Sequence, residues 1–165
     1  MAKKLSGQTV YLAGGYGFDA LGRAGIKEVI SRLEKLGAKI INPFELNATL
    51  GQRMVELKQE LQSGSKRSYQ QIQAEMKAVA LAIGKNNETA ITNCTFVLAI
   101  LDGAQVDDGT ASEIGFAYAV GKQVMGLRTD FRQSGDYPGA MVNLQIEYFI
   151  SASEGEIMTS LDELK

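Results

Sequence analysis

Apolar runs separated by polar, glycine-rich stretches divide the chain into alternating strands and helices. The most apolar run, residues 96–101, is short and contains β-branched residues, which favours a buried strand. Four other runs predict further strands, at residues 9–13, 39–43, 123–128 and 144–150. Strands that alternate with helices along the chain are typical of a parallel sheet, because parallel neighbours need a crossover connection.

Between these strands, apolar residues recur at three- and four-residue spacing, which predicts amphipathic helices. We expect helices at about 20–36, near 50–61, from 69 to about 83, at 110–120 and from 153 onward. Ser68 and Ser153 each stand three residues before a Gln or Glu, the pattern of a capping box at a helix start. The polar stretch 84–87 predicts a break, followed by another helical turn or two leading to Cys94.

This alternation predicts an α/β fold: a flavodoxin-like, doubly wound, five-stranded parallel sheet with helices on both faces. The length of 165 residues is typical of one domain, so we interpret residues 1–165 as a single domain. In such a sheet, ligands bind at the edge formed by the carboxyl ends of the strands. The glycine turn at 14–17, the acidic turn at 102–109 and the loop Arg128-x-Asp130-x-Arg132 should face one cleft there.

Charge and hydropathy narrow the possible partners. The formal net charge is −2, so no broad cationic surface is expected for a nucleic acid polymer or for an anionic membrane. No apolar stretch has the length of a signal peptide or a membrane span, which favours a cytoplasmic protein.

The chain contains one cysteine, Cys94, and no histidine. An intrachain disulfide, a Ser-His or Cys-His nucleophile pair and a histidine-based zinc site are therefore excluded. Any acid–base chemistry must use carboxylates, tyrosine, lysine or backbone dipoles.

We predict neither a metal nor a cofactor. Residues 15–20 match G-x-G-x-x-A after a strand, but a dinucleotide site needs an acidic residue at the end of the second strand. The nearest candidate, Glu45, comes late and lies beyond Pro43. The chain also lacks the G-x-x-x-x-G-K-[ST] phosphate-binding pattern.

Three carboxylates, Asp107, Asp108 and Glu113, lie between the central strand and the next helix. Thr110 and Glu113 can be interpreted as a simple capping box, and the two aspartates as solvated turn residues. Alternatively, Glu113 in the first helical turn is an oxygen nucleophile while Asp107 keeps a proton, the carboxyl pair of a retaining glycosidase. Tyr11, in the first strand, is either a core tyrosine or a contact to such a carboxylate.

Three segments, residues 10–16, 107–117 and 142–144, together resemble the nucleoside 2-deoxyribosyltransferase family, with the D-x-G-[ST]-x-x-E-[IL]-G block as the most specific part. The resemblance implies the flavodoxin-like fold and a double displacement. Glu113 would attack C1′ of a 2′-deoxyribonucleoside and expel the base, and a second free nucleobase would then attack the same carbon.

The resemblance also implies roles for other residues. Asp107 would position the sugar or handle the proton on the base, and Tyr11 would orient the nucleophile. Asn143 would contact a sugar hydroxyl in a site completed by a neighbouring subunit, which implies a homo-oligomer, a dimer or larger. The remaining substrate-binding candidates are Asn87, Gly14, Tyr16 and Asp108.

The chain departs from the family pattern in two places. Asn87 stands where many members have an acid that contacts the base, and an amide cannot protonate a leaving base. That role would fall to Asp107, to water or to no group. Segment 47–68 is long and is interpreted as a lid over the cleft.

Two alternatives remain open. Close relatives hydrolyse deoxynucleoside 5′-monophosphates and use serines around the phosphate, one of them at the position of Asn143. Ser134 is the only nearby candidate for such a serine, so Asn143 favours nucleosides. In the other alternative, the chain is a non-catalytic flavodoxin-like module that binds a nucleoside or nucleotide.

Overall fold

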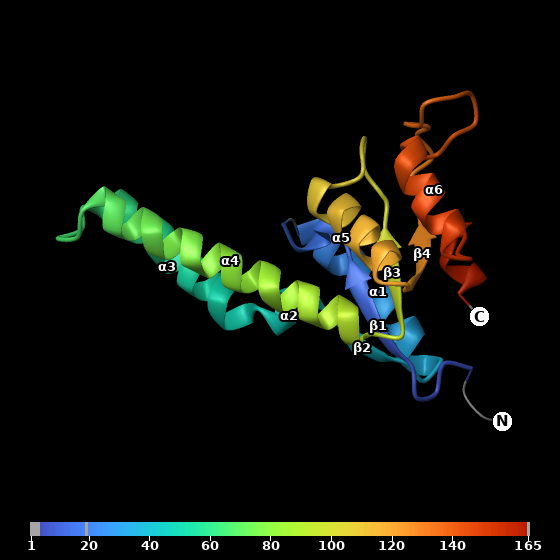
Figure 1. The fold of residues 1–165 in the computed structure, drawn as a ribbon, viewed down its shortest axis with the longest axis horizontal. Coiled ribbons are helices and arrows are strands. Elements are labelled where there is room, and N and C mark those ends of the chain that lie inside the picture. Colours follow the sequence, from blue (N-terminus) through green and yellow to red (C-terminus); the bar gives the residue numbers. More distant parts are fainter. Residues whose placement is uncertain (1–3, 19, 165) are drawn as a thin grey trace.

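The computed structural model describes residues 4–18 and 20–164. Asp19, within the G-x-G-x-x-A match, lies outside the described residues. Five parallel strands form one sheet in the order β2-β1-β3-β4-β5, which confirms the flavodoxin-like prediction (Figure 1). The strands are β1 (Thr9–Ala13), β2 (Lys39–Ile41), β3 (Phe96–Ile100), β4 (Gln123–Leu127) and β5 (Ile157–Met158).

Helices cover both faces of this sheet. The helical elements are η1 (Gly15–Phe18), α1 (Ala20–Lys35), α2 (Pro43–Leu46), α3 (Ala48–Ser63), α4 (Tyr69–Asn93), α5 (Asp108–Ala119), α6 (Leu144–Ala152) and η2 (Leu161–Glu163). Because successive strand residues point to opposite faces, Val10 and Leu12 pack with α1, whereas Tyr11 and Ala13 pack with α4, α5 and α6. Tyr11 is therefore buried on the same face of the sheet as α5.

Residues 144–150, predicted as the fifth strand, form the helix α6 instead. Leu144, Ile146, Tyr148 and Ile150 alternate as in a strand, but only Ile146 and Ile150 are buried, whereas Leu144 and Tyr148 are 53% and 55% exposed. Phe149 packs against the same core as these two isoleucines. Burial at 146, 149 and 150 has helical spacing, so packing overrides the apparent period of two.

The predicted last helix, from residue 153, is also wrong, because this region supplies β5. Ser153 ends α6 instead of starting a helix, and its hydroxyl accepts a hydrogen bond from Val124 N at 2.9 Å. A Cβ at position 155 would lie 1.8 Å from the Val124 carbonyl oxygen, so only glycine allows the chain to pass beside β4 here.

Helix α4 is continuous from Tyr69 to Asn93, so the predicted break at 84–87 is wrong. The helix packs with α3 through Ile72 and Val79 near one end and with the sheet core through Ala90 and Ile91 near the other. Packing at both ends of α4 offsets the unfavourable helix propensity of Gly84, which is about 1 kcal/mol relative to alanine.

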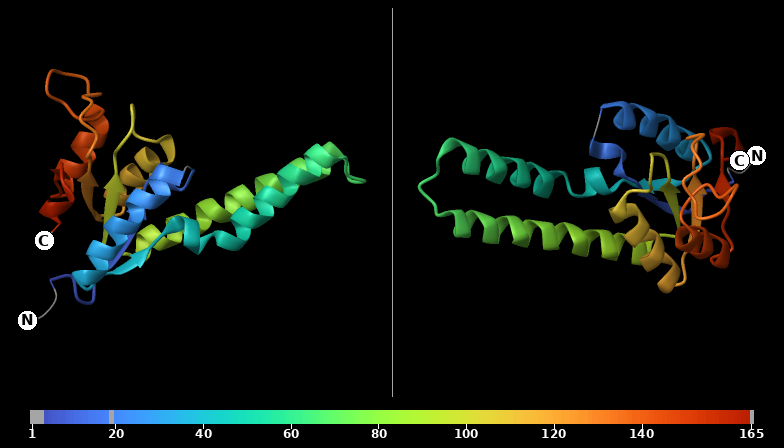
Figure 2. Two further views of the ribbon diagram at one scale, coloured as in Figure 1. Left: turned by 180° about the vertical axis from the view of Figure 1, so that it is seen from behind. Right: turned by 90° about the horizontal axis from the view of Figure 1, so that it is seen from above.

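The paired helices α3 and α4 project away from the sheet as a long hairpin (Figures 1 and 2). The expected lid over the cleft is therefore not seen, and segment 47–68 forms one arm of this hairpin. Within the described ranges, no helix is long and apolar enough to cross a membrane.

Candidate active site

Glu113 lies on α5 and is held by groups from two other elements. The Tyr11 hydroxyl, from β1, donates a hydrogen bond of 2.6 Å to Glu113 Oε1. The Asn87 side-chain amide, from α4, donates to the same oxygen at 3.2 Å. Three of the predicted site residues, distant in sequence, thus meet at one carboxylate.

The environment of this carboxylate is unusual because both donors are neutral. Burial is the largest influence and raises the pKa of Glu113 above its ordinary value. The Tyr11 hydrogen bond opposes this rise, the charge of Asp107 adds to it, and the Asn87 hydrogen bond lowers the pKa again. Burial also raises the pKa of Tyr11 beyond its ordinary value, so its hydroxyl keeps its proton and remains a donor.

Asp107 begins α5. Its Oδ2 accepts hydrogen bonds from Thr110 N at 3.0 Å and from Thr110 Oγ1 at 3.1 Å, so Asp107 is the cap of this helix. Thr110 is therefore not the cap, and Glu113 is bonded to Tyr11 and Asn87. The simple capping-box interpretation of Thr110 and Glu113 is wrong.

Asp108 is exposed, and its Oδ1 accepts a hydrogen bond from Gly109 N at 2.8 Å. Among the described residues, no hydrogen bond joins Asp108 to the hydrogen-bonded group of Glu113, Tyr11 and Asn87. Its substrate-binding role stays a prediction.

Gly14 and Tyr16 support the turn after β1. The buried Tyr16 donates a hydrogen bond to Leu12 O at 3.0 Å, and its ring lies 5.3 Å from that of Phe44. A Cβ at position 14 would lie 2.5 Å from the Tyr16 ring, so glycine is required for this packing. A Cβ at position 15 would lie 3.2 Å from the Asp107 carboxyl, which shows how closely the two turns approach.

Asn143 is exposed and lies at the start of α6. Its Oδ1 accepts from Gln145 N at 3.0 Å, and its Nδ2 donates to Asp136 at 3.1 Å. Among the described residues, no hydrogen bond joins Asn143 to the Glu113 cluster. Ser134 is likewise engaged, since its hydroxyl donates to Met141 O at 3.2 Å.

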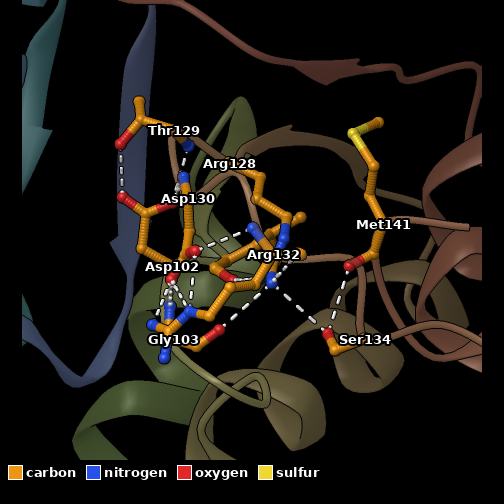
Figure 3. A network of polar contacts seen from close by, with 9 residues as sticks. Asp102, Gly103, Arg128, Thr129, Asp130, Arg132, Ser134 and Met141 are labelled. Carbon is orange, nitrogen blue, oxygen red and sulfur yellow. Dashed lines mark hydrogen bonds and ion pairs between the residues drawn. The ribbon is translucent and has the colours of Figure 1, made fainter.

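The loop after β4 is held by an internal polar network, seen in Figure 3. Asp102 accepts hydrogen bonds from Thr129 N and Asp130 N, at 2.6 and 2.9 Å. The Arg128 guanidinium, only 1% exposed, donates to carbonyl oxygens including those of Leu101 and Gly103. Arg128 therefore stabilises the loop from inside the protein.

A cavity of about 740 Å³ lies at the carboxyl edge on the α1 face of the sheet. Tyr16, Asp102, Asp107 and Thr129 contribute to its lining, whereas Glu113 does not. The acidic turn therefore separates this cavity from the Glu113 cluster, with Asp107 between the two. In the described part of the chain, no cluster of three or more Cys, Asp or Glu side chains could hold a metal ion.

One polar residue of the cluster was not predicted. Asn47, between α2 and α3, is 6% exposed and donates a hydrogen bond to Asn87 Oδ1 at 2.8 Å. An asparagine before a helix is an ordinary capping residue, so the sequence carries no signal of this contact.

The fold and this cluster define a flavodoxin-like α/β protein with a half-buried carboxylate near the carboxyl edge of its sheet. The chain belongs to the nucleoside 2-deoxyribosyltransferase family, whose sequence profile matches residues 10–149. Membership supports an enzyme that acts on N-glycosidic bonds, either as a transferase or as a glycosidase.

Three solved structures are similar to this chain. A conserved protein from Enterococcus faecalis V583 is 26% identical with a TM-score of 0.59, over 95% of this chain and 94% of its own. The 2-deoxyribosyltransferase from Bacillus psychrosaccharolyticus is 20% identical with a TM-score of 0.60, over 94% and 89%. The CMP N-glycosidase from Clostridium botulinum is 19% identical with a TM-score of 0.54, over 94% of each chain. No curated protein matches the chain significantly.

Proposed function

We propose that this protein transfers 2-deoxyribose between nucleobases by double displacement, with Glu113 as the nucleophile. The observation that carries the proposal is that the two oxygens of the Glu113 carboxylate differ in their hydrogen bonding. Oε1 accepts hydrogen bonds from Tyr11 and Asn87, whereas Oε2 has no hydrogen-bond partner among the described residues. One oxygen is thus held in place while the other remains available to form a bond.

In the first step, Glu113 Oε2 attacks C1′ of a 2′-deoxynucleoside. The bond between C1′ and the base nitrogen breaks, and its electron pair leaves with the base. The product is a 2-deoxyribosyl ester of Glu113. In the second step, a nitrogen of another nucleobase attacks C1′, the ester C–O bond breaks, and the carboxylate is regenerated. The attacking nitrogen loses its proton, which replaces the one that the first base took up. Two inversions return the original configuration.

The leaving base needs a proton, and Asn87 cannot supply one. Asp107 is the carboxyl group whose charge acts on Glu113 and which also lines the neighbouring cavity. We assign Asp107 one of two roles: it positions the sugar, or it handles the proton on the base. Gly14, Tyr16, Asp108 and Asn87 shape the binding site around these two acids.

The proposal includes an oligomer. Within the described part of the protomer, Asn143 forms no hydrogen bond with the Glu113 cluster, and we assign its contact with the sugar to the site of a neighbouring subunit. The exposed Leu144 and Tyr148 beside it on α6 offer apolar surface for such a contact.

A second candidate is hydrolysis of a deoxynucleoside 5′-monophosphate, in which water replaces the second base. The structural likeness to a CMP N-glycosidase favours this candidate. Against it, Ser134, the serine considered above for a phosphate, is engaged with Met141 O and with Arg128, at 3.2 and 3.3 Å.

The deciding experiment is a base exchange. The protein is incubated with one 2′-deoxynucleoside and a different free nucleobase, and the products are separated by chromatography. A second incubation contains the corresponding 5′-monophosphate and no added base. A new nucleoside in the first incubation supports the transferase, whereas free base and 2-deoxyribose 5-phosphate in the second support the hydrolase. Binding without turnover of either substrate contradicts both. After incubation without acceptor, the intact mass should increase by one 2-deoxyribosyl group, and mass spectrometry of proteolytic fragments should place it on the peptide that contains Glu113.

A further inference from the structure

A buried asparagine outside the expected motifs contacts the group that holds Glu113. Asn47 Nδ2 donates hydrogen bonds to Pro43 O at 2.9 Å and to Asn87 Oδ1 at 2.8 Å. Asn47 Oδ1 accepts a hydrogen bond from Asn86 Nδ2 at 2.9 Å. Both ends of the Asn47 amide are therefore satisfied, as expected for a side chain that is 6% exposed.

The direction of these hydrogen bonds follows from one backbone group. The Pro43 carbonyl oxygen can only accept, so the atom of Asn47 that faces it must be the amide nitrogen. The reverse orientation would place oxygen against oxygen at Pro43 and nitrogen against nitrogen at Asn86. The backbone of α2 thus determines which way the Asn47 amide points.

The orientation of the Asn47 amide in turn determines the orientation of the Asn87 amide. Because Asn47 offers an N–H to Asn87, the atom of Asn87 that faces it must be Oδ1. The Asn87 Nδ2 is then left to face the Glu113 carboxylate, which accepts from it at 3.2 Å. Without Asn47, the Asn87 amide could turn over and present its oxygen to the carboxylate.

We propose that Asn47 is a positioning residue, which fixes the Asn87 amide so that its N–H faces the Glu113 carboxylate. The orientation of the Asn87 amide does not depend on the proposed function. Only its catalytic use rests on that function, because it requires Glu113 to be the nucleophile. A donor to the ionised form keeps the carboxylate available as a nucleophile at lower pH. The other titratable groups that act on it are Tyr11, Asp107 and Tyr16.

The test compares Asn47→Ala and Asn47→Leu with Asn87→Ala. Each should move the acid limb of the kcat/KM profile to higher pH, by about one unit, because the carboxylate loses a charge-assisted hydrogen bond. The double variant Asn47→Ala/Asn87→Ala should move it no further than Asn87→Ala alone, since both act on one bond. Asn86→Ala should have a smaller effect, because Asn86 does not set the orientation.

Asn93→Ala is the matched control, because Asn93 is an exposed asparagine of the same helix whose amide donates to Thr89 O at 2.9 Å. It should leave the profile unchanged. An Asn47→Ala profile that matches that of Asn93→Ala would overturn the proposal, even if the variant melts at a lower temperature.

A readout independent of activity separates this proposal from the proposed function. The side-chain carboxyl of Glu113, labelled with ¹³C and assigned with Glu113→Gln, is titrated by NMR in each variant. A higher midpoint in Asn47→Ala supports positioning even if no base exchange occurs. An unchanged midpoint overturns it even if exchange is fast.

If the Asn47 variants do not fold, the wild-type protein provides the test through ¹⁵N relaxation of side-chain amides. The Asn87 amide should be rigid on the ps–ns timescale, unlike that of the exposed Gln73 on the same helix. Equal mobility of the two would overturn the proposal.

Discussion

Glu113, near the carboxyl edge of the sheet, and the carboxylates of the α3–α4 hairpin have opposite surroundings. In the hairpin, Glu75 forms ion pairs with Arg53 and Arg67, each at 2.6 Å. Arg53 also pairs with Glu56 at 3.2 Å, and Arg67 with Glu60 at 3.3 Å. Among the described residues, in contrast, the donors to Glu113 are the neutral side chains of Tyr11 and Asn87, and Asp107 is a charged neighbour of the same sign.

This difference appears in the pKa values of the two acids. Hydrogen bonds from Arg53 and Arg67 lower the pKa of Glu75, whereas burial raises the pKa of Glu113. An ion-paired carboxylate is stabilised in its charged form and is a poor nucleophile. A carboxylate without a cation, partly removed from water, keeps its reactivity. The ion pairs of the hairpin carboxylates therefore serve structure, whereas the surroundings of Glu113 suit the nucleophile that we propose it to be.

The largest effect should come from removing the acid at each place. Glu113→Gln should lower kcat for base exchange by at least about 10³-fold, because an amide oxygen cannot form the glycosyl ester. Glu75→Gln should leave kcat close to that of the wild type. Initial rates by chromatography measure both, and full activity of Glu113→Gln would remove the basis of the proposed function.

The next largest effect tests whether a neighbouring subunit supplies Asn143. Asn143→Ala and Glu113→Gln should each be nearly inactive, yet unfolding and refolding them together should restore activity. In a randomly mixed dimer, about a quarter of the sites would combine an intact Glu113 with an intact Asn143. Light scattering measures the assembly size. A mixture no more active than its parents would show that Asn143 acts within its own chain or not at all.

A smaller effect is expected from Tyr11→Phe, which removes one donor and leaves the ring in place. The Tyr11 hydrogen bond lowers the pKa of Glu113, so its loss should raise that pKa. The ionised fraction at a given acidic pH then falls, and the acid limb of the kcat/KM profile moves to higher pH. At the pH optimum, we expect a loss of about 10-fold to 100-fold. An unchanged acid limb would argue against the role of Tyr11.

The strands β1, β3 and β4 were predictable because their apolar runs have lengths and compositions that suit buried strands. The fifth strand was not, because β5 has only the residues Ile157–Met158. A two-residue strand has no periodicity of its own. It forms because Gly155 lets the chain approach β4, where Gly126 N donates to Glu156 O at 2.9 Å.

The site could be predicted only in part. The acidic turn and Tyr11 stand out because their residue types and positions relative to strands suggest chemistry. Asn47 does not, since its importance arises from burial and from the orientation of a single amide. Such information depends on three-dimensional contacts between helices and is absent from local patterns.

The smallest effect concerns the stability of the folded protein. The contributions of Glu113 and Glu75 to this stability should change with pH in opposite directions. Glu113 has a raised pKa in the folded protein, so it contributes more stability at low pH, and that contribution is lost as the pH rises through the folded pKa. Glu75 has a lowered pKa, so its contribution is present above the unfolded pKa and is lost as the pH falls through the folded one.

At pH 7, Glu113→Gln should therefore melt at the same or a slightly higher temperature than the wild type, and Glu75→Gln at a slightly lower one. Calorimetry from pH 3 to pH 8 should show the Glu75→Gln difference shrinking toward acid, and added salt should shrink it at neutral pH because this ion pair is exposed. Salt should change the Glu113→Gln difference less. If both variants changed the melting temperature at pH 7 in the same direction, the proposed difference between Glu113 and the hairpin carboxylates would be wrong.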